Sequence, residues 1–216
     1  MKHVFVAVMI GGAVLAARPA CGQSVAPAGK LSIGGAAGVG AVQNVGPTAA
    51  GTLTVRLTDR IEAIGEGVWM KDVAPRRRIE TAETVAAYLQ TSQGKSASGT
   101  LEIAAVFTGA GARIMLTRSG HIRPYVAVTA GVARLTLRPA FVLSGANVTT
   151  SLPQYGVTLG SDLTGETTKP AFTGGFGVLV DQGRWYIDAG GRVTSIQTEG
   201  QAIKVLRAGG GIWFKF

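Results

Sequence analysis

The feature that most limits how this chain can fold is an alternation of apolar and polar residues with a period of two. In the stretch "WYIDAGGRVTSI" (185–196), one face carries Trp185 and Val193, and the opposite face carries Asp188 and Arg192. Successive side chains of a β-strand point to opposite faces, so this pattern predicts a strand whose two faces meet different surroundings.

The same alternation recurs along most of the chain. The segments that show it are 31–42, 52–58, 61–69, 108–116, 122–135, 171–180, 185–196 and 202–216. Tight turns near residues 59, 119 and 183 join three pairs of them into hairpins. The other connections, 43–51, 71–100, 138–169 and 197–201, are longer. Short turns at one end and long loops at the other indicate an all-β fold: a closed, eight-stranded, antiparallel up-and-down barrel that crosses a membrane.

The long connections contain little regular structure of their own. One short helix is predicted over 78–90, in the second long loop, because Ile79, Ala82, Ala86 and Leu89 form an apolar stripe at helical spacing. The segment 147–166 is predicted to be loop with a turn of helix.

The first residues have the composition of a secretory signal peptide. Lys2 supplies the basic start, Val4–Ala17 is an uncharged apolar run, and Ala20-Cys21-Gly22 forms a small-residue cleavage site. The run of about 14 residues is shorter than the ~20 that a spanning helix needs, which disfavours the alternative of a membrane anchor. Arg18 stands where a lipoprotein signal would carry Leu. We therefore expect residues 1–22 to be removed and residues 23–216 to form one barrel domain.

The composition agrees with an exported barrel. Glycine is abundant, at 32 of 216 residues, whereas charged residues make up only 15%. The formal net charge of +9 would fall to +7 on loss of Lys2 and Arg18. Export and the lack of aromatic residues interleaved with basic ones argue against nucleic acid as a partner. Anionic lipid or lipopolysaccharide is the expected partner surface.

The charged and aromatic residues indicate which face is inside. A membrane barrel places apolar residues outward and polar ones in the lumen, the reverse of a soluble barrel. We predict a lumen charge network of Arg56, Glu62, Glu66, Arg113, Asp188, Arg192, Arg207 and Lys215. Because unpaired charge is costly in a crowded lumen, the carboxylates should pair with neighbouring Arg. Aromatic residues at the strand ends, Trp69, Trp185, Phe214 and Phe216, are predicted to form a girdle at the membrane interfaces.

Taken together, the leader, the eight segments, the loop asymmetry and the final Phe216 resemble small outer-membrane β-barrels of the outer membrane protein A/X type of Gram-negative bacteria. The resemblance covers about residues 31–216, the barrel domain only, without a peptidoglycan-binding domain. It implies that Ile212, Phe214 and Phe216 form the signal read by the barrel-assembly machinery. It also implies localisation in the bacterial outer membrane.

Catalytic chemistry has little support in the sequence. His121 is the one histidine after the leader, and it falls in a predicted turn on the periplasmic side. A nucleophile usually needs an adjacent histidine as base, so no catalytic residues are assigned and the chain is not expected to be an enzyme. No cofactor or metal is expected, since metal sites built on His and Cys need more ligands than the chain offers.

A basic cluster lies in the second long loop. Lys71, Arg76, Arg77 and Arg78 are candidates for contact with lipopolysaccharide phosphates, although a solvated loop with nearby carboxylates explains them equally simply. The expected function is an integral outer-membrane barrel, monomeric, with a narrow or closed lumen and a structural or surface-interaction role. The alternatives are a secreted soluble β-barrel that binds an apolar ligand and a lipid A-modifying enzyme.

Overall fold

The computed structural model describes residues 31–118, 120–199 and 201–216. The predicted signal peptide, residues 1–22, lies outside the described residues. None of the helices within these ranges is long and apolar enough to cross a membrane.

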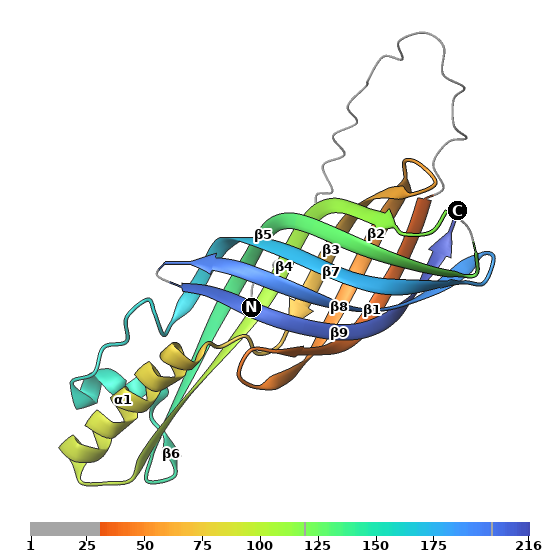
Figure 1. The fold of residues 1–216 in the computed structure, drawn as a ribbon. Helices are drawn as coiled ribbons and strands as arrows, with labels where there is room; N and C mark the ends of the chain where they lie inside the picture. The colour runs from red at the N-terminus through yellow and green to blue at the C-terminus, as the bar shows by residue number, and fades with distance from the viewer. Residues whose placement is uncertain (1–30, 119, 200) are drawn as a thin grey trace.

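The described residues form a closed antiparallel β-barrel (Figure 1). Eight strands make the ring: β1 (Leu31–Ala41), β2 (Val45–Arg56), β3 (Ile61–Met70), β4 (Ala97–Met115), β5 (Ile122–Leu143), β7 (Gly165–Asp181), β8 (Trp185–Thr198) and β9 (Gln201–Lys215). Each pairs with the next along the chain, and β9 closes the ring on β1, with Ser32 opposite Lys215. The predicted eight-stranded up-and-down barrel is therefore confirmed.

Several strands are longer than the alternation predicted. β2 already begins at Val45, so the connection predicted over 43–51 is a short turn. β4, β5 and β7 run 19, 22 and 17 residues, and the loops predicted over 71–100 and 138–169 are correspondingly shorter. The sequence prediction missed these extensions because their inner faces are apolar and pack on loop elements rather than on a polar lumen.

The projecting ends of β4 and β5 carry a small second core beyond the barrel. Helix α1 (Arg76–Gln93), longer than the predicted 78–90, lies along them at the end opposite the C-terminus (Figure 1). Its buried residues are Ala82, Ala86 and Leu89, as its apolar stripe predicted. Strand β6 (Ala146–Asn147) and the 3-10 helix η1 (Thr149–Tyr155) complete this loop-side unit. The end of the barrel that carries it is called the loop side below, and the opposite end the turn side.

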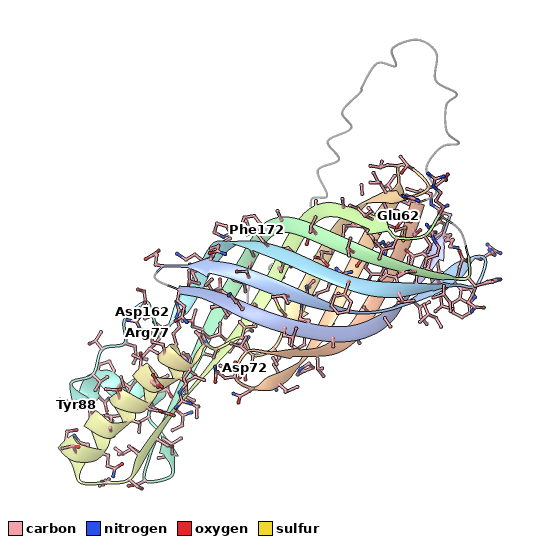
Figure 2. The ribbon with its side chains drawn as sticks, in the orientation of Figure 1. Glu62, Asp72, Arg77, Tyr88, Asp162 and Phe172 are labelled. Atoms are coloured by element: carbon pink, nitrogen blue, oxygen red, sulfur yellow. The ribbon has the colours of Figure 1, made fainter. Side chains whose placement is uncertain are left out.

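The barrel wall separates two kinds of side chain. Apolar residues on the outer surface include Val128, Phe172 and Phe176, which are 63%, 54% and 69% exposed. Glu62 and Arg113 instead point inward and are only 6% and 1% exposed. Figure 2 shows Phe172 on the outer wall of the barrel. A soluble protein buries apolar residues and exposes charges, so this distribution is the reverse of a soluble fold.

Candidate functional site

The turn-side half of the lumen holds a buried charge cluster, defined here as Arg56, Glu62, Arg113 and Asp188. The Arg113 guanidinium donates from Nε and Nη2 to Glu62 Oε2, at 3.0 and 2.6 Å. It lies 3.8 Å from Asp188 Oδ2, and Arg56 lies 3.8 Å from the other Glu62 oxygen. These residues come from β2, β3, β4 and β8, so the turn-side cluster ties opposite walls of the barrel together.

Two tyrosines complete the hydrogen bonding of this cluster. Arg113 Nη2 donates to the Tyr186 hydroxyl at 3.1 Å. The Tyr125 hydroxyl donates to both Asp188 oxygens, at 2.8 and 3.0 Å. The Arg113 guanidinium also sits over the rings of Tyr125 and Tyr186, 5.1 and 5.7 Å from their centroids. Buried charges are tolerated when they are paired and hydrogen-bonded, and Glu62, Arg113 and Asp188 meet that condition. Arg56 is paired with Glu62, but its Nε has no hydrogen-bond partner within the described residues.

A second group, the mid-barrel cluster, consists of Glu66, Thr129, Arg192, Thr194 and Arg207. Glu66 accepts a hydrogen bond from Thr129 Oγ1 at 2.6 Å and pairs with Arg192. Arg207 stands directly across the β8–β9 ladder from Arg192. It donates from Nε and Nη2 to Thr194 Oγ1, at 3.2 and 3.0 Å. All three predicted lumen carboxylates therefore lie beside Arg, whereas Arg207 binds a hydroxyl.

The loop-side half of the lumen is filled by apolar side chains, which the sequence prediction did not foresee. The members of this apolar plug are Val68, Met70, Phe107, Leu135, Ile196 and Val205, all at most 1% exposed. They are continuous with the loop-side core under α1. Apolar filling at one end and ion pairs at the other leave little free space within the lumen.

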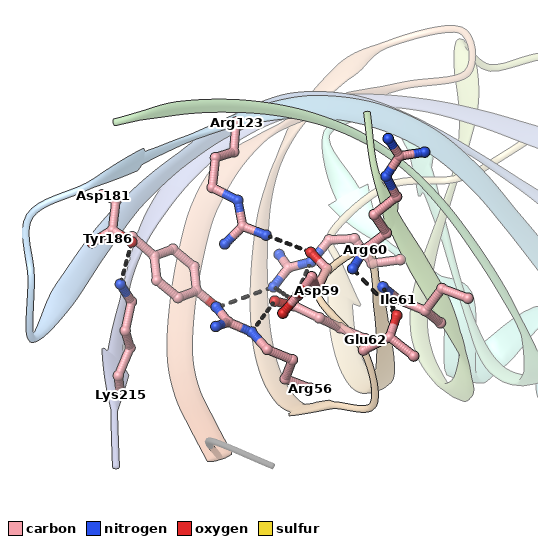
Figure 3. Close-up of polar contacts among 11 residues, drawn as sticks. Arg56, Asp59, Arg60, Ile61, Glu62, Arg123, Asp181, Tyr186 and Lys215 are labelled. Carbon is pink, nitrogen blue, oxygen red and sulfur yellow. Dashed lines mark hydrogen bonds and ion pairs between the residues drawn. The ribbon is translucent and has the colours of Figure 1, made fainter. Parts of the chain in front are cut away.

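Lys215 lies apart from the other predicted network residues. It pairs with Asp181 at the turn-side rim (Figure 3). Partial burial raises the pKa of the Asp181 carboxyl. Hydrogen bonds from Lys215 and the Gly183 N–H outweigh that effect, and the net pKa lies below its usual value. Lys215 thus anchors the end of β9 to the β7–β8 turn.

The predicted aromatic residues lie on the outer surface near the strand ends. Trp69 is near the loop side, whereas Trp185, Phe214 and Phe216 are near the turn side, and their exposures range from 37% to 73%. Trp185 and Phe214 are direct neighbours across β8 and β9. Ile212, two residues before Phe214, faces the same way and is 49% exposed. The alternation in the last strand therefore presents its apolar residues outward.

The predicted basic cluster borders an open groove at the loop side, called the rim groove. Its volume is about 720 Å³, and its lining includes Arg76, Arg77, Lys204, Gln43 and Gln201. Figure 2 shows Arg77 at the end of α1 that lies nearest the barrel.

The cations around this groove differ in their partners. Arg76 donates to Glu80 at 2.8 Å, within the first turn of α1, so its charge is locally balanced. Arg77 and Lys204 have no ion-pair partner among residues 31–118, 120–199 and 201–216. Lys71 is exposed nearby, and Arg78 is half-buried.

His121 lies in the turn between β4 and β5, at the turn side of the barrel, as predicted from its position in the sequence. It is exposed, and its Nδ1 is 3.3 Å from the backbone carbonyl oxygen of Asp181. Within the described ranges, no group of three or more His, Cys, Asp or Glu residues is placed to hold a metal ion.

Three lumen residues that contact the charge clusters were not predicted as members of the network: Tyr125, Thr129 and Tyr186. Tyr186 also stacks on Trp213, with ring centroids 5.7 Å apart and planes inclined by 5°. A signal was available for Tyr186, which alternates in phase with Asp188 and Arg192 of the same strand. Lys204 at the rim groove gave no such signal, because only the closed barrel brings it near α1.

Comparison with known proteins shows the fold. No family model matches the chain, and no curated protein matches its sequence. Among solved structures the chain is similar to Neisserial surface protein A (NspA), with 14% identity and a TM-score of 0.52 over 87% of this chain and 97% of that one.

Two further barrels are similar at lower scores. Ail, the attachment invasion locus protein of Yersinia pestis, is 12% identical, with a TM-score of 0.46 over 87% of this chain and 97% of its own. The N-terminal β-barrel domain of Pseudomonas aeruginosa OprF is 16% identical, with a TM-score of 0.46 over 87% of this chain and 99% of that domain.

Proposed function

We propose that this protein is an integral β-barrel of the bacterial outer membrane with a structural or surface-interaction role, a closed lumen and no enzymatic activity. The observation that carries the proposal is the inverted distribution of side chains. Val128, Phe172 and Phe176 cover the outer wall, whereas Glu62 and Arg113 are buried inside. A lipid bilayer stabilises an apolar outer surface, and a closed barrel leaves no strand edge unpaired in it.

The same observation disfavours a secreted soluble carrier. Such a barrel would bury an apolar cavity for its ligand and place its charges on the surface. Here the charges occupy the interior and the large apolar side chains the exterior.

Cell fractionation tests the proposal. We expect the protein in the outer-membrane fraction, extractable only with detergent and folded in detergent micelles. A matched control is a known periplasmic soluble protein from the same cells, which should leave with the osmotic shock fluid. Recovery of the folded chain in that fluid would contradict the proposal.

Deletion of Phe216 is expected to impair insertion by the barrel-assembly machinery, the partner that the last strand is proposed to engage. Phe216 is 73% exposed, and its side chain is not needed for the interior packing. Its backbone N–H still donates to the Leu31 carbonyl at 2.8 Å, so the matched control is Phe216→Ala, which retains that bond. The measurement is the amount of folded barrel in the outer membrane. Both variants should be depleted, and normal insertion of Phe216→Ala would contradict an assembly role for the aromatic side chain.

The rim groove supports a proposed contact with lipopolysaccharide phosphates. Arg77 and Lys204 supply the charge, and the N-terminus of α1 adds the positive end of a helix dipole. We expect the double variant Arg77→Gln, Lys204→Gln to lose about a hundredfold or more in lipopolysaccharide affinity, since two charge-assisted hydrogen bonds are each worth roughly 1.5–3 kcal/mol and every ~1.4 kcal/mol is tenfold. The measurement is the rise in melting temperature when lipopolysaccharide is added to the barrel folded in detergent micelles. Lys95→Gln, at the far end of α1, is the control, and an equal loss with it would refute a site at the groove.

A further inference from the structure

The barrel contains a small cavity in the middle of the lumen. Its volume is about 60 Å³, and its walls come from β1, β2, β5, β8 and β9. Its lining includes small residues such as Ala36, Gly38 and Gly209. It also includes the charged groups Asp188, Arg192 and Arg207, together with Trp213 and Tyr125. The many glycines and alanines of β1 and β9 therefore create a space that is lined by polar groups.

Hydrogen-bond donors outnumber free acceptors around this cavity. Arg192 and Arg207 are donors only, and so is the Trp213 indole. Trp213 is 2% exposed, and its Nε1 has no acceptor in the part of the chain that the structure describes. The carboxylate of Asp188 is already occupied, because it accepts from Tyr125 and faces Arg113. An additional acceptor in the cavity would satisfy donors that the protein leaves open.

The charge balance around the cavity points the same way. Glu66 is the carboxylate of the mid-barrel cluster, and it binds Arg192 and Thr129. Arg207 is 7% exposed, and no carboxylate lies within ion-pair distance of it among residues 31–118, 120–199 and 201–216. The one carboxylate of the mid-barrel cluster thus pairs with Arg192, and Arg207 is left without a counter-charge in the described part of the chain. A buried cation without a counter-charge is costly, so a mobile anion would stabilise this arrangement.

We infer that this cavity binds one small monovalent anion, such as chloride, between Arg192 and Arg207. A halide ion fits about 60 Å³, in which only a few water-sized groups find room, whereas a phosphorylated lipid does not. The anion would accept from both guanidinium groups. This inference needs only the closed barrel and does not depend on the rim groove or on the membrane location.

Bromide tests the site because it replaces chloride and scatters anomalously. We expect crystals of the micellar barrel in sodium bromide to show an anomalous peak between Arg192 and Arg207. In solution, sodium chloride should raise the melting temperature above that in sodium gluconate of equal ionic strength, since a ligand that binds only the folded state stabilises it. The Arg207→Gln variant should lose both the peak and the chloride-specific shift.

Two further variants keep the test decisive. Arg207→Lys keeps a cation at the site and removes the guanidinium fork, so it should weaken the halide effect without abolishing it even if Arg207→Gln fails to fold. Arg134→Gln removes an exposed cation on the outer surface, paired with Glu166, and should leave the effect unchanged. A cavity without an anomalous peak, or a chloride shift that persists in Arg207→Gln, would overturn the inference.

Discussion

Replacing Arg113 with alanine is expected to lower the free energy of unfolding by about 3–5 kcal/mol, because it leaves Glu62 and Asp188 as buried charges without their cation. Arg113 is 1% exposed and contacts both carboxylates and Tyr186. The measurement is reversible urea unfolding of the barrel in lipid vesicles or detergent, followed by tryptophan fluorescence.

The matched control for Arg113 is the exposed pair of Arg134 and Glu166. Arg134→Ala should cost no more than about 1 kcal/mol, as solvent screens such pairs. The double variant Glu62→Gln, Arg113→Met should recover part of the stability lost by Arg113→Ala, because it removes the Glu62 charge together with its partner and leaves Asp188 as the carboxylate without its cation. Equal costs for Arg113→Ala and Arg134→Ala would show that the turn-side cluster does not tie the barrel together.

Replacing Gly38 with alanine is expected to destabilise the barrel by about 1–3 kcal/mol, the usual cost of forcing extra atoms into a filled interior. A Cβ at Gly38 would lie 2.2 Å from the Ala208 carbonyl oxygen and 2.7 Å from the Gly209 Cα, so β1 and β9 would have to separate. These are the two strands that close the ring. The same urea unfolding experiment measures the effect.

Gly51 provides the control on the outer surface. A Cβ there meets nothing within 4 Å, and it points away from the lumen. Gly51→Ala should therefore be neutral or add about 0.5–1 kcal/mol, because glycine in a strand costs conformational entropy. If Gly38→Ala destabilised the barrel no more than Gly51→Ala does, the close approach of β1 and β9 at Gly38 would not limit the stability of the barrel.

Much of the fold could be predicted from the sequence because a membrane-type barrel repeats a simple pattern. The alternation in 185–196 fixes which residues face inward, and a slip of one residue would expose every charge to the outside. The same reasoning placed Glu62, Asp188 and Arg192 on the inner face. It failed at the loop side, where Phe107 and Val205 also face inward, because an apolar plug and an apolar outer wall look alike in sequence.

Contacts between residues far apart in the sequence could not be predicted in this way. Arg113 and Glu62 are direct neighbours on β4 and β3 but 51 residues apart, and Arg192 and Glu66, on β8 and β3, are 126 apart. Alternation assigns a side chain to a face but says nothing about its height in the barrel or its neighbour across the lumen. Those depend on strand tilt and register, which are properties of the closed ring.

The strand pattern, the inward and outward faces and the outward apolar residues of the last strand follow from local alternation, because each depends on residues two apart. The meeting of particular charges, the position of α1 and the filling of the lumen depend instead on how the ring closes. The pairing of Arg207 with a hydroxyl and the cavity beside it belong to this second group. They arise where strands that are distant in the sequence converge, and no local pattern records that convergence.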